Sequence, residues 1–225
     1  MAIIILDDKG GLLVFTQLGN VFTQASLWVW RIMHLNWAWI LHTILGGVVL
    51  GLFPATLSMF YISKKWLKGG IDDGIWREFH RYYKENFWVA NGLGWAYAFV
   101  GVFLVWDLYI VTQIQGFFPL LCMIAIIFAL IFYVFAFFYL FSYYVCFKGS
   151  FKDYLFQPFI IGLLNLRGNT TIAIGIIMIC YLIYQLPGLV LFTAGVMPSY
   201  WIMKVSLNNF KKWISEEECK KMEVL

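Results

Sequence analysis

The chain has 225 residues, of which 62% are hydrophobic and only 12% are charged, and this composition excludes an ordinary water-soluble globular protein. Apolar runs longer than about 18 residues recur, as in helices that cross a bilayer. The net charge is only +4, which points to anionic lipid head groups as partners, and we expect no binding of nucleic acid.

The first apolar block, residues 21–62, is about twice as long as one crossing requires. We expect a hairpin of two spans, at 24–45 and 48–67, with its turn at the glycines of residues 46–51. Pro54 suits the first residue of the returning helix, where its missing N–H is harmless. The lysines at the end of this helix can reach the head groups and so extend a short span.

An amphipathic cytoplasmic helix is predicted over residues 73–86, after the second span. Its apolar side chains recur at helical spacing on one face, at Trp76, Phe79, Tyr83 and Phe87. Arg77, Arg81 and Lys84 favour the opposite face, and they are candidate partner-docking residues. Such a helix normally lies in the head-group plane. Two roles stay open, namely a brace for the bundle and a docking surface for a cytoplasmic partner.

Four further spans are expected in the rest of the chain. The third is predicted at 87–110 and the fourth at 117–147, which is over-long for a hydrocarbon layer of about 30 Å. The last apolar block also exceeds one crossing and contains Pro187 and the string Gly195-Val196-Met197-Pro198. It therefore predicts a second hairpin, with spans at 171–187 and 188–207.

The strings Gly51-x-x-Pro54 and Gly195-x-x-Pro198 each open a helix that ends in lysines. This correspondence favours an internal repeat, and transporters are often built from repeats with broken helices. A chance recurrence in glycine-rich membrane sequence is the alternative.

The distribution of charge predicts the orientation. With six spans, all sixteen Lys and Arg residues fall on one side of the membrane, as the positive-inside rule favours for the cytoplasmic side. If either terminal block crossed only once, a large basic cluster would lie outside. The sequence thus predicts an all-α, polytopic helical membrane bundle of about six spans, with five as the alternative. We expect it in the cell membrane with both termini cytoplasmic.

Few polar side chains interrupt the spans, and ionisable groups there are functional candidates. Asp107 is the only formally charged side chain on the outer half of this topology. It is a candidate outer polar site for an ion or substrate, or else an interfacial carboxylate in water. Asn36 is expected to hydrogen-bond to a neighbouring helix. His34 and His42 lie eight residues apart, which is not the spacing of helical metal ligands, so no metal site is predicted.

Nucleophile arrangements, phosphate-binding glycine loops and paired carboxylates are all missing from the sequence. We therefore predict no catalytic residue, no cofactor and no enzymatic activity. Small residues in the third span instead favour the close approach of another helix. They are Gly92, Gly94, Ala96, Ala98 and Gly101.

Several strings resemble the YesL family of small bacterial membrane proteins in order and spacing. They are Leu35-Asn36-Trp37-Ala38-Trp39, Gly51-Leu52-Phe53-Pro54-Ala55-Thr56, Lys65-Trp66-Leu67 and Tyr83-Lys84-Glu85-Asn86-Phe87, followed by Ala90-Asn91 and Gly94. The close similarity covers about residues 28–94, with a looser hydropathy match beyond. The family supplies no catalytic residues, so only motif positions carry over: Asn36, Trp39, Pro54, Ala55, Thr56, Asn86 and Phe87.

The resemblance implies no assigned biochemical activity, but it implies genes placed beside carbohydrate ABC importers, polysaccharide-degrading enzymes and two-component sensors. We therefore expect a non-enzymatic accessory membrane protein of a Gram-positive bacterium. Its expected partners are membrane lipids and either subunits of a carbohydrate ABC importer or a sensor histidine kinase. A small transporter or channel is one alternative, favoured by the broken helices and Asp107. A structural or lipid-binding membrane protein is another.

Overall fold

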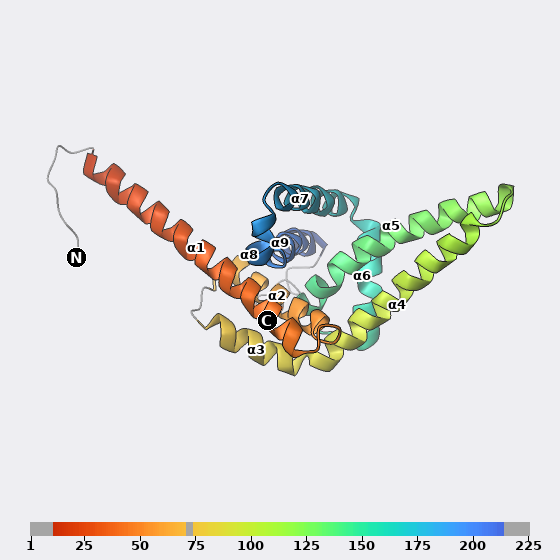
Figure 1. The fold of residues 1–225 in the computed structure, drawn as a ribbon, viewed down its shortest axis with the longest axis horizontal. Coiled ribbons are helices and arrows are strands. Elements are labelled where there is room, and N and C mark those ends of the chain that lie inside the picture. The colour runs from red at the N-terminus through yellow and green to blue at the C-terminus, as the bar shows by residue number, and fades with distance from the viewer. Residues whose placement is uncertain (1–10, 71–73, 214–225) are drawn as a thin grey trace.

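The structure is a computed structural model that describes residues 11–70 and 74–213, and every regular element in these ranges is a helix. The helices are α1 (Gly11–Leu45), α2 (Leu52–Leu67), α3 (Ile75–Glu85), α4 (Phe87–Thr112), α5 (Phe117–Cys146), α6 (Phe151–Leu164), α7 (Leu166–Gln185), η1 (Pro187–Leu189), α8 (Val190–Thr193) and α9 (Val196–Trp213). The predicted all-α fold is confirmed. Helix α1 projects to one side of a central bundle, and the long α4–α5 hairpin projects to the other (Figure 1).

Helices α1 and α2 form the predicted hairpin. The turn between them uses a positive φ of 75° at Gly47, a backbone conformation that glycine adopts without strain. At its end the backbone of Gly51 packs so closely against the carbonyl group of Thr43 that a side chain would have no room. The two glycines therefore allow the chain to reverse between helices that remain in close contact.

The prediction that Pro54 is the first residue of its helix is wrong by two positions. Helix α2 begins at Leu52, which makes Pro54 its third residue. The first N–H groups of a helix have no intrahelical acceptor, so the proline is equally harmless there. Helix α9 begins at Val196 with Pro198 in third place, and the two Gly-x-x-Pro strings thus start their helices in the same register.

Helix α3 packs along the α1–α2 hairpin rather than beyond one end of it. Near the start of α3, Glu78 forms an ion pair with Lys65 at the end of α2, with 2.7 Å between Oε1 and Nζ. Near the end of α3, the hydroxyl of Tyr83 donates a hydrogen bond of 3.2 Å to the carbonyl of His42, close to the turn. The sequence placed this turn and this helix on opposite sides of the membrane. In the structure the two are in contact, and the side of the membrane on which each lies stays a prediction.

Helix α3 is amphipathic as predicted, but its apolar face differs in one residue. Phe79 and Tyr83 are buried, whereas Trp76 is 40% exposed and the neighbouring Ile75, at 8%, takes its place in the core. The predicted start at residue 73 lies outside the described residues. A single residue, Asn86, separates α3 from α4, so the two helices follow each other almost without interruption.

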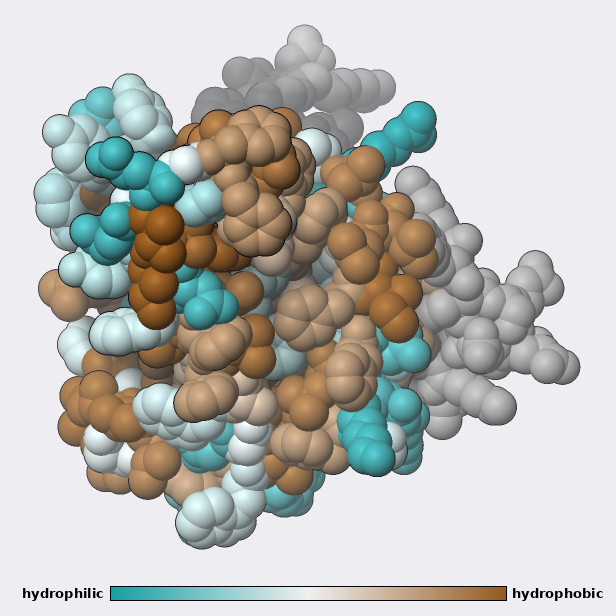
Figure 2. Space-filling view, turned by 90° about the vertical axis from the view of Figure 1, so that its right-hand side faces the viewer, coloured by the Kyte–Doolittle hydropathy of each residue, from teal (hydrophilic) through white to brown (hydrophobic). Residues whose placement is uncertain are grey.

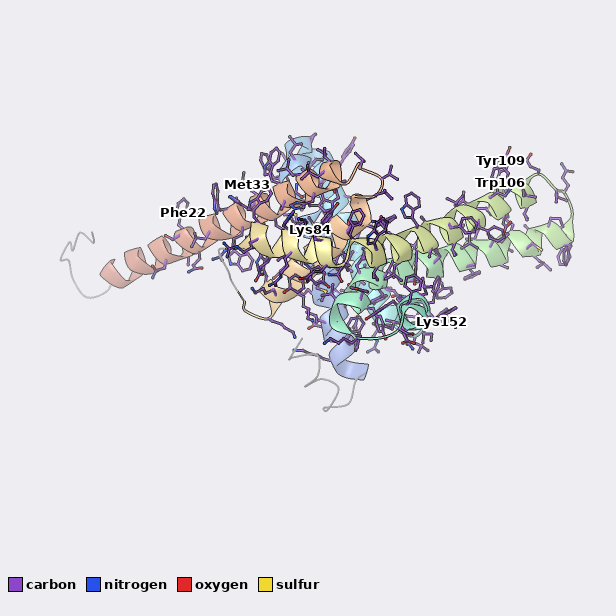
Figure 3. All side chains as sticks on the ribbon, turned by 90° about the horizontal axis from the view of Figure 1, so that it is seen from below. Phe22, Met33, Lys84, Trp106, Tyr109 and Lys152 are labelled. Atoms are coloured by element: carbon purple, nitrogen blue, oxygen red, sulfur yellow. The ribbon has the colours of Figure 1, made fainter. Side chains whose placement is uncertain are left out.

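Helices α4 and α5 occupy the positions predicted for the third and fourth spans. Their close approach depends on the predicted small residues, because Gly101 lies against the ring of Tyr133 with no space for a side chain. The Tyr133 hydroxyl donates a hydrogen bond of 2.9 Å to the carbonyl of Tyr97. Trp106 and Tyr109 lie near the tip of the hairpin (Figure 3).

The last apolar block is a helix followed by a bent pair, not two straight spans. Helix α7 ends at Gln185, and the segment Pro187–Thr193 is bent by 61° from the segment Val196–Lys211. The break falls at Ala194 and Gly195, within the predicted span 188–207. The string Gly195-Val196-Met197-Pro198 therefore marks a bend inside the predicted span 188–207.

Among the described residues, three helices are long and apolar enough to cross a membrane, namely α4, α5 and α7, and the bent pair gives up to four. Their outward side chains include Phe99, Phe117 and Ile177, which are at least 67% exposed and suit contact with lipid. Figure 2 shows one end of the molecule, where hydrophobic residues form broad areas. The count of six spans, or of five, stays a prediction, since α2 has only 16 residues.

Candidate functional site

The motif residue Asn36 lies where α1 meets the break between α8 and α9. Its side chain is fully buried. The Nδ2 atom donates a hydrogen bond of 2.8 Å to the carbonyl of Leu191, and the Oδ1 atom accepts one of 3.1 Å from the amide of Gly195. A helix break leaves backbone groups without helical partners, and this carboxamide supplies partners on both sides. The predicted hydrogen bond from Asn36 to a neighbouring helix is confirmed.

A second motif pair joins α1 to α2 beside the same break. The indole Nε1 of Trp39 donates a hydrogen bond of 3.1 Å to Oγ1 of Thr56, which itself donates one of 2.7 Å to the carbonyl of Leu52. A side chain at Gly195 would lie only 3.2 Å from Cδ2 of Trp39. Asn36, Trp39 and Thr56 therefore meet at one place, which we call the motif junction.

Two further motif residues shape the backbone of α2 next to this junction. Ala55 is fully buried in the same apolar cluster as Leu35, Ala38 and Met59. The carbonyl of Pro54 accepts a hydrogen bond of 2.8 Å from the hydroxyl of Ser58. Both residues are small or compact, so they let α2 pack closely against α1 and carry no reactive group.

The last two motif residues act at a different place, the joint between α3 and α4. The Oδ1 atom of Asn86 accepts a hydrogen bond of 2.7 Å from the Tyr144 hydroxyl of α5, and its Nδ2 donates one of 2.9 Å to the carbonyl of Tyr82. Phe87 packs edge-on against Tyr83, with ring centroids 5.5 Å apart. The motif residues therefore hold the connection between α3 and α4 in place, in addition to the motif junction.

A contact that the sequence did not predict joins α1 to α3. The Nε2 atom of His42 lies 3.0 Å from Nδ1 of His80, and Nδ1 of His42 lies 2.8 Å from the carbonyl of Ala38. When both rings are neutral, His42 donates to Ala38 and accepts from His80. The two histidines are 38 positions apart, and no spacing rule connects them. His34 takes no part, since its Nδ1 contacts the carbonyl of Trp30.

The histidine pair is surrounded by aromatic rings, and no group of three or more potential metal ligands gathers among the described residues. The His42 ring lies within 6.2 Å of the rings of Trp76, Phe79 and Tyr83, measured between centroids. Burial raises the pKa of the Tyr83 hydroxyl, so this group remains a neutral donor.

An apolar cavity of about 390 Å³ lies beside the motif junction. It is lined by residues of α1, α2, α7 and α9, namely Trp28, Ile32, Trp66, Ile179, Val196, Met197, Tyr200 and Trp201. Trp28 and Trp66 meet edge to face, with ring centroids 5.7 Å apart. The indole N–H of Trp201 is already engaged, because it donates a hydrogen bond of 3.2 Å to the carbonyl of Thr171. The lining therefore suits an apolar ligand and contains no carboxylate, imidazole or amine.

The other predicted site residues lie apart from the junction. Arg77, Arg81 and Lys84 are exposed on α3, as their position on the polar face predicts. Asp107 is partly buried between Trp106 and Tyr109 near the hairpin tip (Figure 3). Nothing brings Asp107 to the motif residues, and its role as a polar site stays a prediction.

The fold and the site define a polytopic, all-helical membrane protein whose motif side chains hold a broken helix in place. Residues 32–108 match the family described as "Protein of unknown function, DUF624", a range that includes every motif position. The chain is 28% identical over 211 residues to "Uncharacterized protein YesL" of Bacillus subtilis (strain 168), covering 93% of this chain and 99% of that protein. No solved structure matches the chain.

Two more proteins of the same organism are similar. "Uncharacterized protein YesV" is 29% identical over 182 residues, which cover 81% of this chain and 88% of that protein. "Uncharacterized protein YteU" is 28% identical over 183 residues, which cover 79% of this chain and 80% of that protein. The resemblance to the YesL family that the sequence motifs predict is therefore confirmed.

Proposed function

We propose that this chain is a non-enzymatic accessory protein of the cell membrane that associates with a carbohydrate ABC importer or its sensor histidine kinase. The observation that supports this proposal is the basic face of α3. Arg77, Arg81 and Lys84 are exposed there, and none of them forms an ion pair with any residue in the described ranges. A row of cations on one face complements an acidic surface of a partner.

The basic face belongs to α3, and this helix is attached to the α1–α2 hairpin by several side-chain contacts. The ion pair from Glu78 to Lys65, the contact of His80 with His42 and the hydrogen bond from Tyr83 all tie α3 to the α1–α2 hairpin. A surface that is already ordered loses little conformational entropy when a partner binds. This arrangement favours a docking surface over a helix that only lies among lipid head groups.

The orientation that we propose places this face in the cytoplasm. Lys84 and Lys152 lie toward the base of the α4–α5 hairpin, far from Trp106 and Tyr109 near its tip (Figure 3). The tip, residues 113–116, contains no Lys or Arg. By the positive-inside rule the base is the cytoplasmic end, and we propose that both termini lie on that side.

Charge reversal tests the docking face. We expect Arg77→Glu, Arg81→Glu and Lys84→Glu together to leave the protein inserted but to abolish co-purification of an importer or kinase subunit from native membranes. The matched control reverses three other exposed basic residues, Lys148, Lys152 and Arg167, and should keep the partner. Retention of the partner by the α3 variant would reject the docking face, and loss in both variants would indicate only a general effect of charge.

A small transporter is the second candidate, and the 61° bend between α8 and α9 favours it. Transporters commonly place their binding sites where helices are broken. In this chain, however, Asn36 already pairs with the backbone at the break. Flux of a sugar or an ion into liposomes that contain the purified chain alone would support transport over the accessory role.

A further inference from the structure

The apolar cavity beside the motif junction lies between α1 and α9, and α2 and α7 complete its lining. The two helices are joined where Asn36 bonds to Gly195. From that point α1 projects away from the bundle toward its N-terminus (Figure 1), and it leaves a space that aromatic side chains line. Residues four apart face the same side of a helix, so Trp28 and Ile32 form one wall and Val196 and Tyr200 form another.

The lining selects hydrocarbon over polar ligands. A volume of about 390 Å³ falls within the range of small-molecule sites, about 300–1,000 Å³. A sugar or a charged metabolite would leave most of its polar groups without hydrogen bonds in this predominantly apolar lining, which is costly. The indole N–H of Trp201 is engaged with Thr171 and cannot serve such a ligand. A flexible alkyl chain, in contrast, fills an apolar cavity without leaving polar groups unpaired.

Two basic side chains, Arg31 and Lys204, lie on the helices that line this cavity. Each of them is close in the chain to residues of the lining, since Arg31 precedes Ile32 on α1 and Lys204 follows Tyr200 on α9 by one turn. The guanidinium carbon of Arg31 lies 5.8 Å from the centre of the Trp28 ring. Lys204 is exposed one turn beyond Tyr200. Neither cation forms an ion pair with a residue of the described part of the chain.

We propose that this cavity binds one acyl chain of an anionic phospholipid, whose head-group phosphate lies at Arg31 and Lys204. An amphiphile of this kind matches both an apolar cavity and the cations on the helices that line it. The site is independent of the docking face on α3, and it would take its lipid from the surrounding bilayer. The bound lipid would then fix the angle between α1 and α9.

Lipid binding to the full-length protein in detergent tests the proposal. Native mass spectrometry should show one phosphatidylglycerol bound more tightly than phosphatidylcholine. Phosphatidylglycerol with brominated chains should also quench part of the tryptophan fluorescence in a saturable way, because Trp28, Trp66 and Trp201 line the cavity. Equal affinity for the two lipids, or quenching that never saturates, would overturn the specific site and leave only ordinary lipid contact.

Two kinds of variant locate the lipid. Ile179→Phe places a larger side chain in the cavity and should weaken binding by about tenfold or more, whereas Ile177→Phe is the control on the same helix, because Ile177 is 67% exposed and does not line the cavity. Binding to Ile179→Phe at the wild-type affinity would contradict the proposal.

The second kind of variant removes the head-group contact without touching the core. Arg31→Gln with Lys204→Gln should reduce the preference for phosphatidylglycerol by about tenfold, while Lys152→Gln should leave it unchanged. These surface substitutions keep the test decisive even if Ile179→Phe does not fold. An undiminished preference in the double variant would reject Arg31 and Lys204 as the head-group site.

Discussion

The amide of Gly195 donates a hydrogen bond of 3.1 Å to the side chain of Asn36, across 159 positions of the chain. The same carboxamide donates to the carbonyl of Leu191, so one side chain satisfies both ends of the helical hydrogen bond from residue 195 to residue 191 that the break removes. A buried backbone group without a partner costs about 1–3 kcal/mol. The bend between α8 and α9 therefore depends on a residue of the first helix.

Replacing this side chain should destabilise the protein. We expect Asn36→Leu to lower the free energy of unfolding by about 2–4 kcal/mol, because two buried backbone groups lose their partners. The measurement is thermal unfolding in detergent, followed by circular dichroism. Asn20→Leu makes the same change at an exposed position of α1 and should have little effect. Equal stability of the two variants would contradict the role of the junction.

The histidine pair gives a second prediction. His80→Ala leaves Nε2 of the buried His42 without its partner, and we expect a loss of about 1 kcal/mol in stability. Arg81→Ala, at the next and exposed position, is the control. Hydrogen exchange should show faster opening of α3 in the His80 variant only. If both variants exchange alike, the pair does not hold α3 in place.

A glycine in α7 gives the third prediction. A side chain at Gly175 would overlap the indole of Trp201, so Gly175→Ala should displace this ring, break its hydrogen bond to Thr171 and cost about 1–3 kcal/mol. Gly19→Ala in α1 meets nothing within 4 Å and should be neutral or slightly stabilising, because alanine favours helix. Thermal stability of both variants in one detergent would decide the matter.

The start of α6 has a pH dependence that can be tested. Asp153 accepts hydrogen bonds from the amide and hydroxyl of Ser150, at 2.7 and 2.8 Å, and these bonds hold the pKa of its carboxyl below the usual value. The folded protein therefore binds this proton less readily than the unfolded chain does. The contribution of Asp153 to folding stability is complete above the pKa of this carboxyl in the unfolded chain. It is lost as the pH falls through the pKa in the folded protein.

We accordingly expect Asp153→Asn to be less stable than the wild type at neutral pH, because the amide is a weaker acceptor at the N-terminus of a helix. The difference should shrink as the pH falls below the folded pKa. Unfolding measured over a pH series checks this, with Glu85→Gln as a carboxyl control. A difference that stays constant with pH would show that ionisation of Asp153 is not involved.

The contact of Tyr83 with His42 gives a prediction of sidedness. In a cysteine-free background, single cysteines at Gly47 and at Arg81 should react with an impermeant thiol reagent from the same side of the membrane. A cysteine at Gly116, at the tip of the α4–α5 hairpin, should react from the opposite side. Labelling of Gly47 and Gly116 together from outside, with Arg81 protected, would contradict the packing of α3 along the first hairpin.

The sequence predicted helices well where the pattern was local. Helices α1 and α2 end at Leu45 and Leu67, where glycines and lysines predict their ends. Helix α4 begins at Phe87, where the amphipathic pattern gives way to an apolar one. The hydrogen bond of Asn36 to another helix was also predictable, because a carboxamide in an apolar helix requires a partner. What the pattern did not contain was the identity of that partner.

The remaining features depend on tertiary contacts that no local pattern encodes. Periodicity placed Trp76 on the buried face of α3, but the packing of α3 against α1 buries Ile75 instead. The approach of His80 to His42 and the aromatic cavity both join segments that are distant in the sequence. The packing of α3 back along the first hairpin was not predicted, because hydropathy and charge rank segments by composition, while this packing depends on specific side-chain bonds.

The long interval between Asn36 and its partners also constrains the order of assembly during synthesis. Asn36 is made early, whereas Gly195 follows 159 residues later. At 5–20 residues per second the ribosome needs roughly 8–32 s to supply it. During that interval the carboxamide must find temporary partners, and α1 cannot reach its final place. The nascent first hairpin therefore cannot complete its packing until residue 195 has been made. A truncation before residue 195 would leave this hairpin incompletely folded and accessible to quality-control proteases.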